Sequence, residues 1–236
     1  KLSQSSPIPA LHFLLGELPA EAALDIHTLN LFHNVWTNSH TTVFNMVTYI
    51  MAMCSTSSTT WSKHIQLLCY KYGLPAPLTL LQNTPWSKSS WSCLVKTRVT
   101  LWHENILKRK ALSNSKMCFL NVQLHGLTGQ PHKVLHNITT TQEAKKLRLH
   151  LKFLVNDFLT NERRSLDQPT ISPACVLCHA PLDSIEHVLV VCRATSDLRD
   201  RLLPELLNTV AMVQPMCQLL ALAPAPHILT QFVLDC

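Results

Sequence analysis

Residues 141–160 read TQEAKKLRLHLKFLVNDFLT, and this stretch decides the fold class. Its apolar residues Leu147, Leu151, Leu154 and Phe158 follow one another by 4, 3 and 4 positions. This spacing places them on one stripe of an α-helix, the stripe that a globular protein buries. We therefore predict a helix over 141–160.

The same stretch carries Lys145, Arg148 and Lys152, which lie 3 and 4 positions apart. Cations at this spacing stand about one helical turn apart along one side. Such a row can follow the phosphates of a nucleic acid. The alternative is a solvated basic face without a ligand.

The wider sequence around this helix is basic. Residues 88–164 hold fourteen Lys and Arg but four Asp and Glu, whereas the rest of the chain holds six and ten. The concentration of positive charge indicates a surface for a polyanion. Lys108, Arg109 and Lys110, at the end of a second predicted helix, are further candidates for phosphate contacts.

Apolar residues at helical spacing also occur on both sides of this region. Only four glycines are present, which argues against a turn-rich β fold. We expect helices over 18–36, 41–54, 61–72, from Ser89 or Ser90 to 112, and from Thr195 or Ser196 onward, the last kinked or split at Pro204. Residues 117–127 fit a short strand or a helix. The predicted fold class is mostly α, an irregular helical bundle with a small zinc-stapled CCHC knuckle near the C-terminus.

The knuckle is predicted from four residues with the spacing Cys175-x2-Cys178-x8-His187-x4-Cys192. Zinc prefers four such ligands in a tetrahedron, and Cys3His is a common set for structural sites. A catalytic zinc keeps one position open, so four ligands indicate one structural Zn²⁺. The alternatives are buried thiols with a core histidine, or His179 in place of His187.

Four cysteines outside the knuckle are expected to be unreactive free thiols. Nine cysteines are an odd number, and no signal peptide pattern begins the chain, so a disulfide framework is not indicated. Cys54, Cys69, Cys93 and Cys118 are predicted as buried free thiols. No apolar run approaches 18 residues, and we expect an intracellular protein of the nucleus or cytoplasm, without membrane or small-molecule partners.

Several short stretches resemble the region behind the polymerase of non-LTR retrotransposons, especially jockey-like elements. They are Leu14 to Pro19, Ser90 to Lys96, Leu151 to Thr160, Glu162-Arg163, Ala174 to Cys178, Ile185 to Leu189, and Val191-Cys192 with Arg199 and Arg201 after it. The family often has Gly after the second Cys, whereas this chain has His179. The resemblance implies a zinc knuckle that helps to hold template RNA or target DNA.

The polymerase itself is missing from this sequence. No Tyr-x-Asp-Asp motif is present, and the few acidic residues offer no two-metal site. We therefore expect no enzyme in the chain on its own, but an accessory piece of a reverse transcriptase polyprotein. Because the first residue is Lys, the chain is expected to be a fragment.

Four regions are predicted from these features. They are a helical linker region (1–87), a basic helical region (88–166), the zinc-knuckle segment with its following helix (167–212) and an apolar tail (213–236). Two other functions remain open: a zinc-stabilised helical module for protein interaction, and a decayed transposon fragment without activity.

Overall fold

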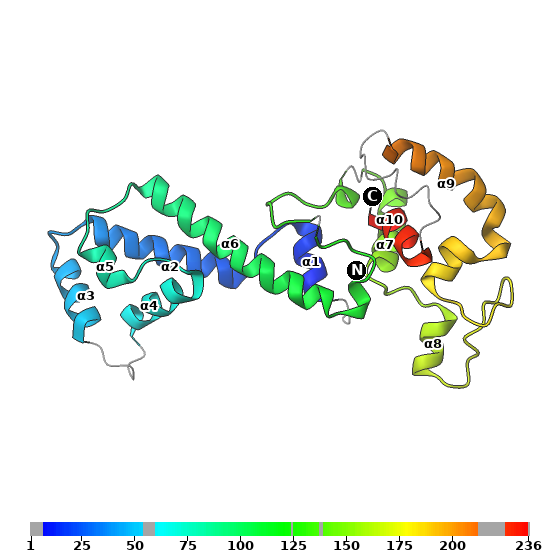
Figure 1. Ribbon diagram of the computed structural model, residues 1–236, viewed down its shortest axis with the longest axis horizontal. Coiled ribbons are helices and arrows are strands. Elements are labelled where there is room, and N and C mark those ends of the chain that lie inside the picture. The colour runs from blue at the N-terminus through cyan, green and yellow to red at the C-terminus, as the bar shows by residue number, and fades with distance from the viewer. Residues whose placement is uncertain (1–6, 54–59, 124, 137–138, 212–224, 236) are drawn as a thin grey trace. The chain divides into compact units, whose positions relative to one another are not determined.

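A computed structural model describes residues 7–53, 60–123, 125–136, 139–211 and 225–235 of the chain (Figure 1). The structure is 68% helical and has no strand among these residues, so the predicted mostly α class is confirmed. The chain divides into two compact units, one comprising residues 16–107 and 127–130 and the other residues 1–15, 108–126 and 131–236. The four predicted regions follow motifs rather than contacts and stay predictions.

The unit of residues 16–107 and 127–130 consists of helices packed around one apolar core. The helices are α2 (Ala20–Thr37), α3 (Thr42–Met53), α4 (Trp61–Tyr72), α5 (Pro77–Leu81) and α6 (Lys88–Leu112), the last belonging to this unit up to Leu107. Leu29, Phe32, Ile65, Trp91 and Val95 are fully buried members of the core. This burial of apolar surface is the main stabilising contribution in the unit.

Helix α4 shows how local sequence sets an element's ends. The hydroxyl of Thr60 accepts a hydrogen bond from the backbone N–H of Lys63, which caps the first turn. Gly73 has a φ of 62°, the left-handed conformation that glycine adopts without strain. The predicted range of 61–72 is confirmed at both ends.

Helix α2 buries a face that includes polar as well as apolar side chains. Leu24 and Leu31 are exposed, whereas the buried residues are Ala22, Asp25, Leu29, Phe32, His33 and Trp36. The buried face includes a carboxylate and an imidazole, which a search for apolar residues passes over. Both are hydrogen-bonded within the unit, which makes their burial tolerable.

The other unit contains α1 (Ile8–Leu15) and the elements that follow α6. These are the 3-10 turns η1 (Ser115–Met117) and η2 (Lys133–Leu135), α7 (Thr141–Leu154), α8 (Asn161–Asp167), the π-helix η3 (His187–Val191), the 3-10 turn η4 (Arg193–Thr195), α9 (Ser196–Ala211) and α10 (Pro226–Asp235). Helix α10 packs against both α7 and η3. It therefore joins the basic helix to the segment that carries the cysteines.

Helix α7 begins as predicted, but it ends earlier. Thr140 and Glu143 form a reciprocal capping box, in which the carboxylate of Glu143 accepts from the N–H groups of Thr139 and Thr140. These backbone N–H groups lower the pKa of Glu143 to about 2. The helix ends at Leu154, because Asn156 adopts a φ of 48° that no α-helix continues through. The prediction of a helix to residue 160 was wrong.

Other expectations for this unit need correction. Residues 118–123 and 125–127 form neither a strand nor a helix. Pro204 lies inside a continuous α9, so the helix is not split there, and the alternative of a kink at Pro204 stays a prediction. The helix α10 occupies most of the described part of the predicted apolar tail, and Leu234 on it is buried. No helix among the described residues is long and apolar enough to cross a membrane.

Candidate metal centre

A tight turn presents the first two cysteines. The N–H of Cys175 donates to the carbonyl oxygen of Ala180 at 2.9 Å, and the N–H of His179 donates to the carbonyl oxygen of Cys175 at 2.9 Å. His179 has a φ of 60°, the left-handed conformation that glycine adopts most readily, so the chain turns sharply at this residue. The turn places Cys175 and Cys178 near each other.

The other two predicted ligands, His187 and Cys192, lie at the first residue of the short π-helix η3 and directly after its last residue. His187 begins η3, and the N–H of Cys192 donates to the carbonyl oxygen of His187 at 2.6 Å, closing a wide helical turn. The hydroxyl of Ser184 accepts from the N–H of His187, which fixes the start of this turn. The five-residue step therefore brings both side chains to the same side of η3.

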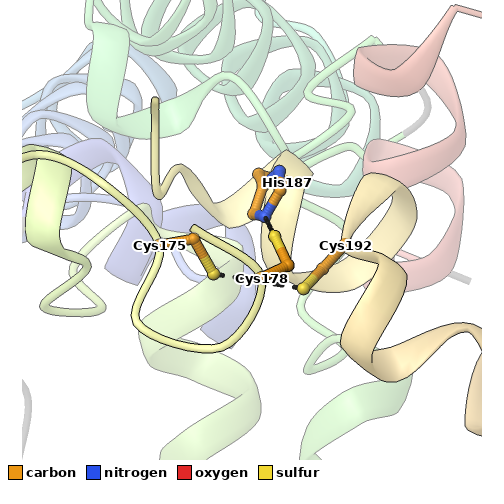
Figure 2. Close-up of side chains that lie close together, drawn as sticks. All are labelled: Cys175, Cys178, His187 and Cys192. Atoms are coloured by element: carbon orange, nitrogen blue, oxygen red, sulfur yellow. Dashed lines mark hydrogen bonds between the residues drawn. The ribbon is translucent and has the colours of Figure 1, made fainter. Parts of the chain in front are cut away.

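The four predicted ligand side chains point toward one another (Figure 2). The sulfur atoms of Cys175 and Cys192 are 4.0 Å apart, Cys178 Sγ lies 3.1 Å from His187 Nε2, and all four ligand atoms lie within 4.8 Å of one another. Ligands at ordinary zinc distances in a tetrahedron are separated by roughly 3.5–3.8 Å. The residues Cys175, Cys178, His187 and Cys192 thus form a group that can hold a metal ion.

The two cysteines of the turn differ in their acidity. Backbone hydrogen bonding from Ala180, assisted by the neighbouring cysteines and His187, lowers the pKa of Cys178 to about 7. Burial raises the pKa of the Cys175 thiol, with partial compensation from the N–H groups of Cys178 and Leu177. A divalent cation would favour the thiolate at both positions, since the thiolate is the form that binds metal.

The surroundings of this group show which histidine belongs to it and how the neighbouring elements are attached. His179 is exposed and is not a member of the group, so His187 is the histidine that fits. The carboxylate of Glu186, the residue before His187, contacts Nδ1 of His227 on α10 at 3.0 Å. Arg199 on α9 donates to the carbonyl oxygen of Cys192 at 3.1 Å and so ties that helix to the group.

The predicted phosphate contacts lie on two helices of the same unit. On α7, Lys145 and Arg148 are exposed and Lys152 is half-buried, while Leu154 is fully buried. At the end of α6, Arg109 and Lys110 are exposed and Lys108 is half-buried. Exposed cations along the outer side of a helix, such as Lys145 and Arg148 on α7, can contact the phosphates of a polyanion.

The expectation for the other cysteines holds in part. Cys69 is buried, and burial raises the pKa of its thiol to about 12, so it is inert. Cys118 is half-buried, while Cys93 is exposed on α6, contrary to the prediction. Cys54 lies outside the described residues.

Two other groups of potential ligands were missed by the sequence reasoning. They are His125, His132 and Asp235 in one unit, and Glu21, Asp25 and His103 in the other. Their members are far apart in sequence, so no short motif announces them. A hint was available only in the histidine count of 13, which is high for this length.

Comparison with known proteins adds no relative. No family model, no curated protein and no solved structure matches the chain.

Proposed function

We propose that the chain is a zinc-binding, nucleic-acid-binding accessory region of a non-LTR retrotransposon protein that lacks the polymerase core. The observation that carries this proposal is the convergence of Cys175, Cys178, His187 and Cys192. Zinc would be bound by three thiolates and Nε2 of His187, filling all four positions, and would hold the turn, η3 and the start of α9 together. The chain itself would then perform no catalysis.

The nucleic-acid part of the proposal rests on charge and position. Lys145, Arg148 and Lys152 follow one another along α7, and α10 packs against both α7 and η3. Zinc binding would therefore steady the element that carries these three cations. In the intact parent protein, the region would hold template RNA or target DNA near the polymerase.

The salt dependence of binding tests this role. Each phosphate contact that a cation makes adds about 0.7 to the slope of log affinity against log salt for single strands, and about 0.9 for duplex DNA. We expect steep dependence for an RNA hairpin, and a slope reduced by about 2 when Lys145, Arg148 and Lys152 are changed to Gln together.

A matched control variant distinguishes the effect of the three α7 cations from the effect of net charge alone. Lys88, Lys96 and Arg98 are three exposed cations of α6, and their change to Gln removes the same charge. We expect this variant to keep most of the salt slope. If both triple variants lost it equally, or the wild type bound equally at 0.05 and 0.3 M salt (roughly a sixfold range), the assignment to α7 would fail.

A second function, a helical module for protein interaction, is favoured by one observation. Helix α3 exposes apolar side chains along one stretch, namely Val43, Met46, Tyr49 and Met53, each more than half exposed. Clustered exposed apolar residues mark interaction surfaces. This candidate predicts complex formation that is insensitive to salt and to nuclease.

A further inference from the structure

The histidine and aspartate group at the C-terminal helix is the strongest feature outside the cysteine site. Asp235 ends α10, while His125 and His132 belong to the chain segment between η1 and α7. His125 Nε2 lies 3.0 and 2.9 Å from the two carboxylate oxygens of Asp235. His132 Nε2 lies 3.3 Å from Oδ1 of Asp235 and 3.3 Å from Nε2 of His125.

Two of these separations, both 3.3 Å, match the edge of a tetrahedral zinc site, while the His125–Asp235 contacts at 2.9 and 3.0 Å are somewhat shorter. Two ligand atoms that each lie about 2.0–2.1 Å from a zinc ion in a tetrahedron are roughly 3.3 Å apart. Direct hydrogen bonds account less well for the contact between the two Nε2 atoms, because two ring N–H groups that share one carboxylate repel each other. A cation between the three groups would remove that repulsion.

We propose that His125, His132 and Asp235 form a second zinc site, with two imidazoles and one carboxylate as ligands. This donor set suits Zn²⁺, and three protein ligands leave a position for water. The side chains of His132 and Asp235 are 2% and 5% exposed, and that of His125 is 20% exposed, so the site lies just beneath the surface with His125 as its outer member.

A neighbouring hydrogen bond defines what the ion must displace. The N–H of Val134 donates to Nδ1 of His132 at 3.2 Å, so in the metal-free ring the proton is on Nε2 and faces Asp235. A neutral ring that binds zinc through Nε2 carries its proton on Nδ1, so the Val134 hydrogen bond would be given up. Zinc binding at this site therefore relocates one proton within the His132 ring.

The third group of potential ligands, Glu21, Asp25 and His103, does not carry the same inference. The ammonium of Lys71 lies 2.7 Å from a carboxylate oxygen of Glu21 and 3.1 Å from one of Asp25. A cation is therefore already in place there. Asp235 has no such partner among the ion pairs of the described residues, where its contacts are the two histidines and the N–H of Asn121.

Zinc content of the purified chain tests the proposal by mass spectrometry of the metal. We expect two equivalents in the wild type, one in His125→Gln, one in Cys178→Ser and none in the double variant. His125 is changed because it is the most exposed of the three ligands and its loss disturbs packing least. His136→Gln is the control, since His136 is exposed and contacts the carbonyl oxygen of Pro131 instead.

Cobalt substitution gives a second readout that does not depend on folding of a variant. The cysteine site should show thiolate-to-cobalt charge-transfer absorption, whereas the second equivalent of Co²⁺ should bind without any increase in that absorption. One zinc that disappears in Cys178→Ser would overturn the second site and leave the cysteine site standing. Two equivalents that both survive His125→Gln would also overturn it, and no zinc at all would overturn both sites.

Discussion

Gly16 lies directly against the carbonyl oxygen of Gln130. A Cβ atom at position 16 would stand 2.0 Å from that oxygen, and the carbonyl oxygen of Gly16 accepts a hydrogen bond from the N–H of Gly129 at 2.8 Å. Gly16 also has a φ of 67°. Sterics and conformation therefore both require glycine at this crossing of two chain segments.

The comparison of Gly16→Ala with Gly73→Ala separates these two requirements. Both glycines have a positive φ, but a Cβ at Gly73 meets nothing within 4 Å. We expect Gly73→Ala to cost about 1 kcal/mol for the backbone conformation, and Gly16→Ala to cost about 2 kcal/mol more. Urea unfolding followed by tryptophan fluorescence measures both, because all five Trp residues lie between positions 36 and 102. Equal losses would mean that the Gln130 backbone moves aside freely.

Trp91 is expected to be the most sensitive core position of the same unit. Its side chain is fully buried, and its Nε1–H donates to the carbonyl oxygen of Leu29 at 3.1 Å. We expect Trp91→Ala to lower the free energy of unfolding by about 3–5 kcal/mol. Leu101→Ala on the same helix, where Leu101 is half exposed, should cost less than about 1 kcal/mol. A similar loss in both variants would contradict the packing described here.

Asp235 makes the metal-free protein sensitive to acid. Burial alone would raise the pKa of Asp235, but hydrogen bonds with His125 and His132 and from the N–H of Asn121 outweigh it, so the pKa lies below its ordinary value. A lowered carboxyl pKa contributes stability above the unfolded pKa of about 3.9, and that stability is lost as the pH falls through the folded pKa.

The amide of Asn121 reports this titration, because its N–H donates to Asp235 Oδ2 at 2.8 Å. In chelator-treated protein, we expect the NMR shift of that amide to titrate with a midpoint below about 3.9. Asp235→Asn should abolish the titration. A midpoint at or above the ordinary value would show that the histidines do not stabilise the carboxylate.

Cys178 should be required for zinc at the cysteine group. Cys178→Ser removes one of four ligands, and we expect the loss of one equivalent of zinc per chain with faster amide exchange over His187–Val191. Cys93→Ser, at an exposed thiol of α6, should change neither. Unchanged zinc content in Cys178→Ser would show that Cys178 is not a zinc ligand and that the cysteine group does not hold the ion.

Local sequence signals predicted the elements whose ends depend on local chemistry. The range of α4 follows from Thr60 and Gly73, and the start of α7 follows from Thr140. Gly73 was recognisable as a helix end because glycine adopts the left-handed conformation most readily, but an end formed by another residue in that conformation was not predicted. Asn156 ends α7 with a positive φ, a conformation that asparagine adopts less often than glycine at helix ends, so its effect was not predicted.

The candidate metal sites also differ in whether local sequence or tertiary packing brings their residues together. The cysteine group is local, since its members fall within eighteen residues, and its convergence was predicted from spacing. Asp235 meets His125 across a separation of 110 positions, and Asp25 meets Tyr72 across 47. Such pairs arise from tertiary packing, which no short pattern encodes.

Helix α10 gives the last residues of the chain a role in two neighbouring elements. Leu234 accepts a hydrogen bond from His150 of α7 at 2.6 Å, and His227 contacts Glu186 beside the cysteine group. A shortened version ending before Pro226 would therefore lose the helix that packs against both α7 and η3. Anyone who trims this protein to a minimal cysteine-bearing fragment must keep residues 226–235, and a fusion partner is better attached elsewhere than directly after Asp235.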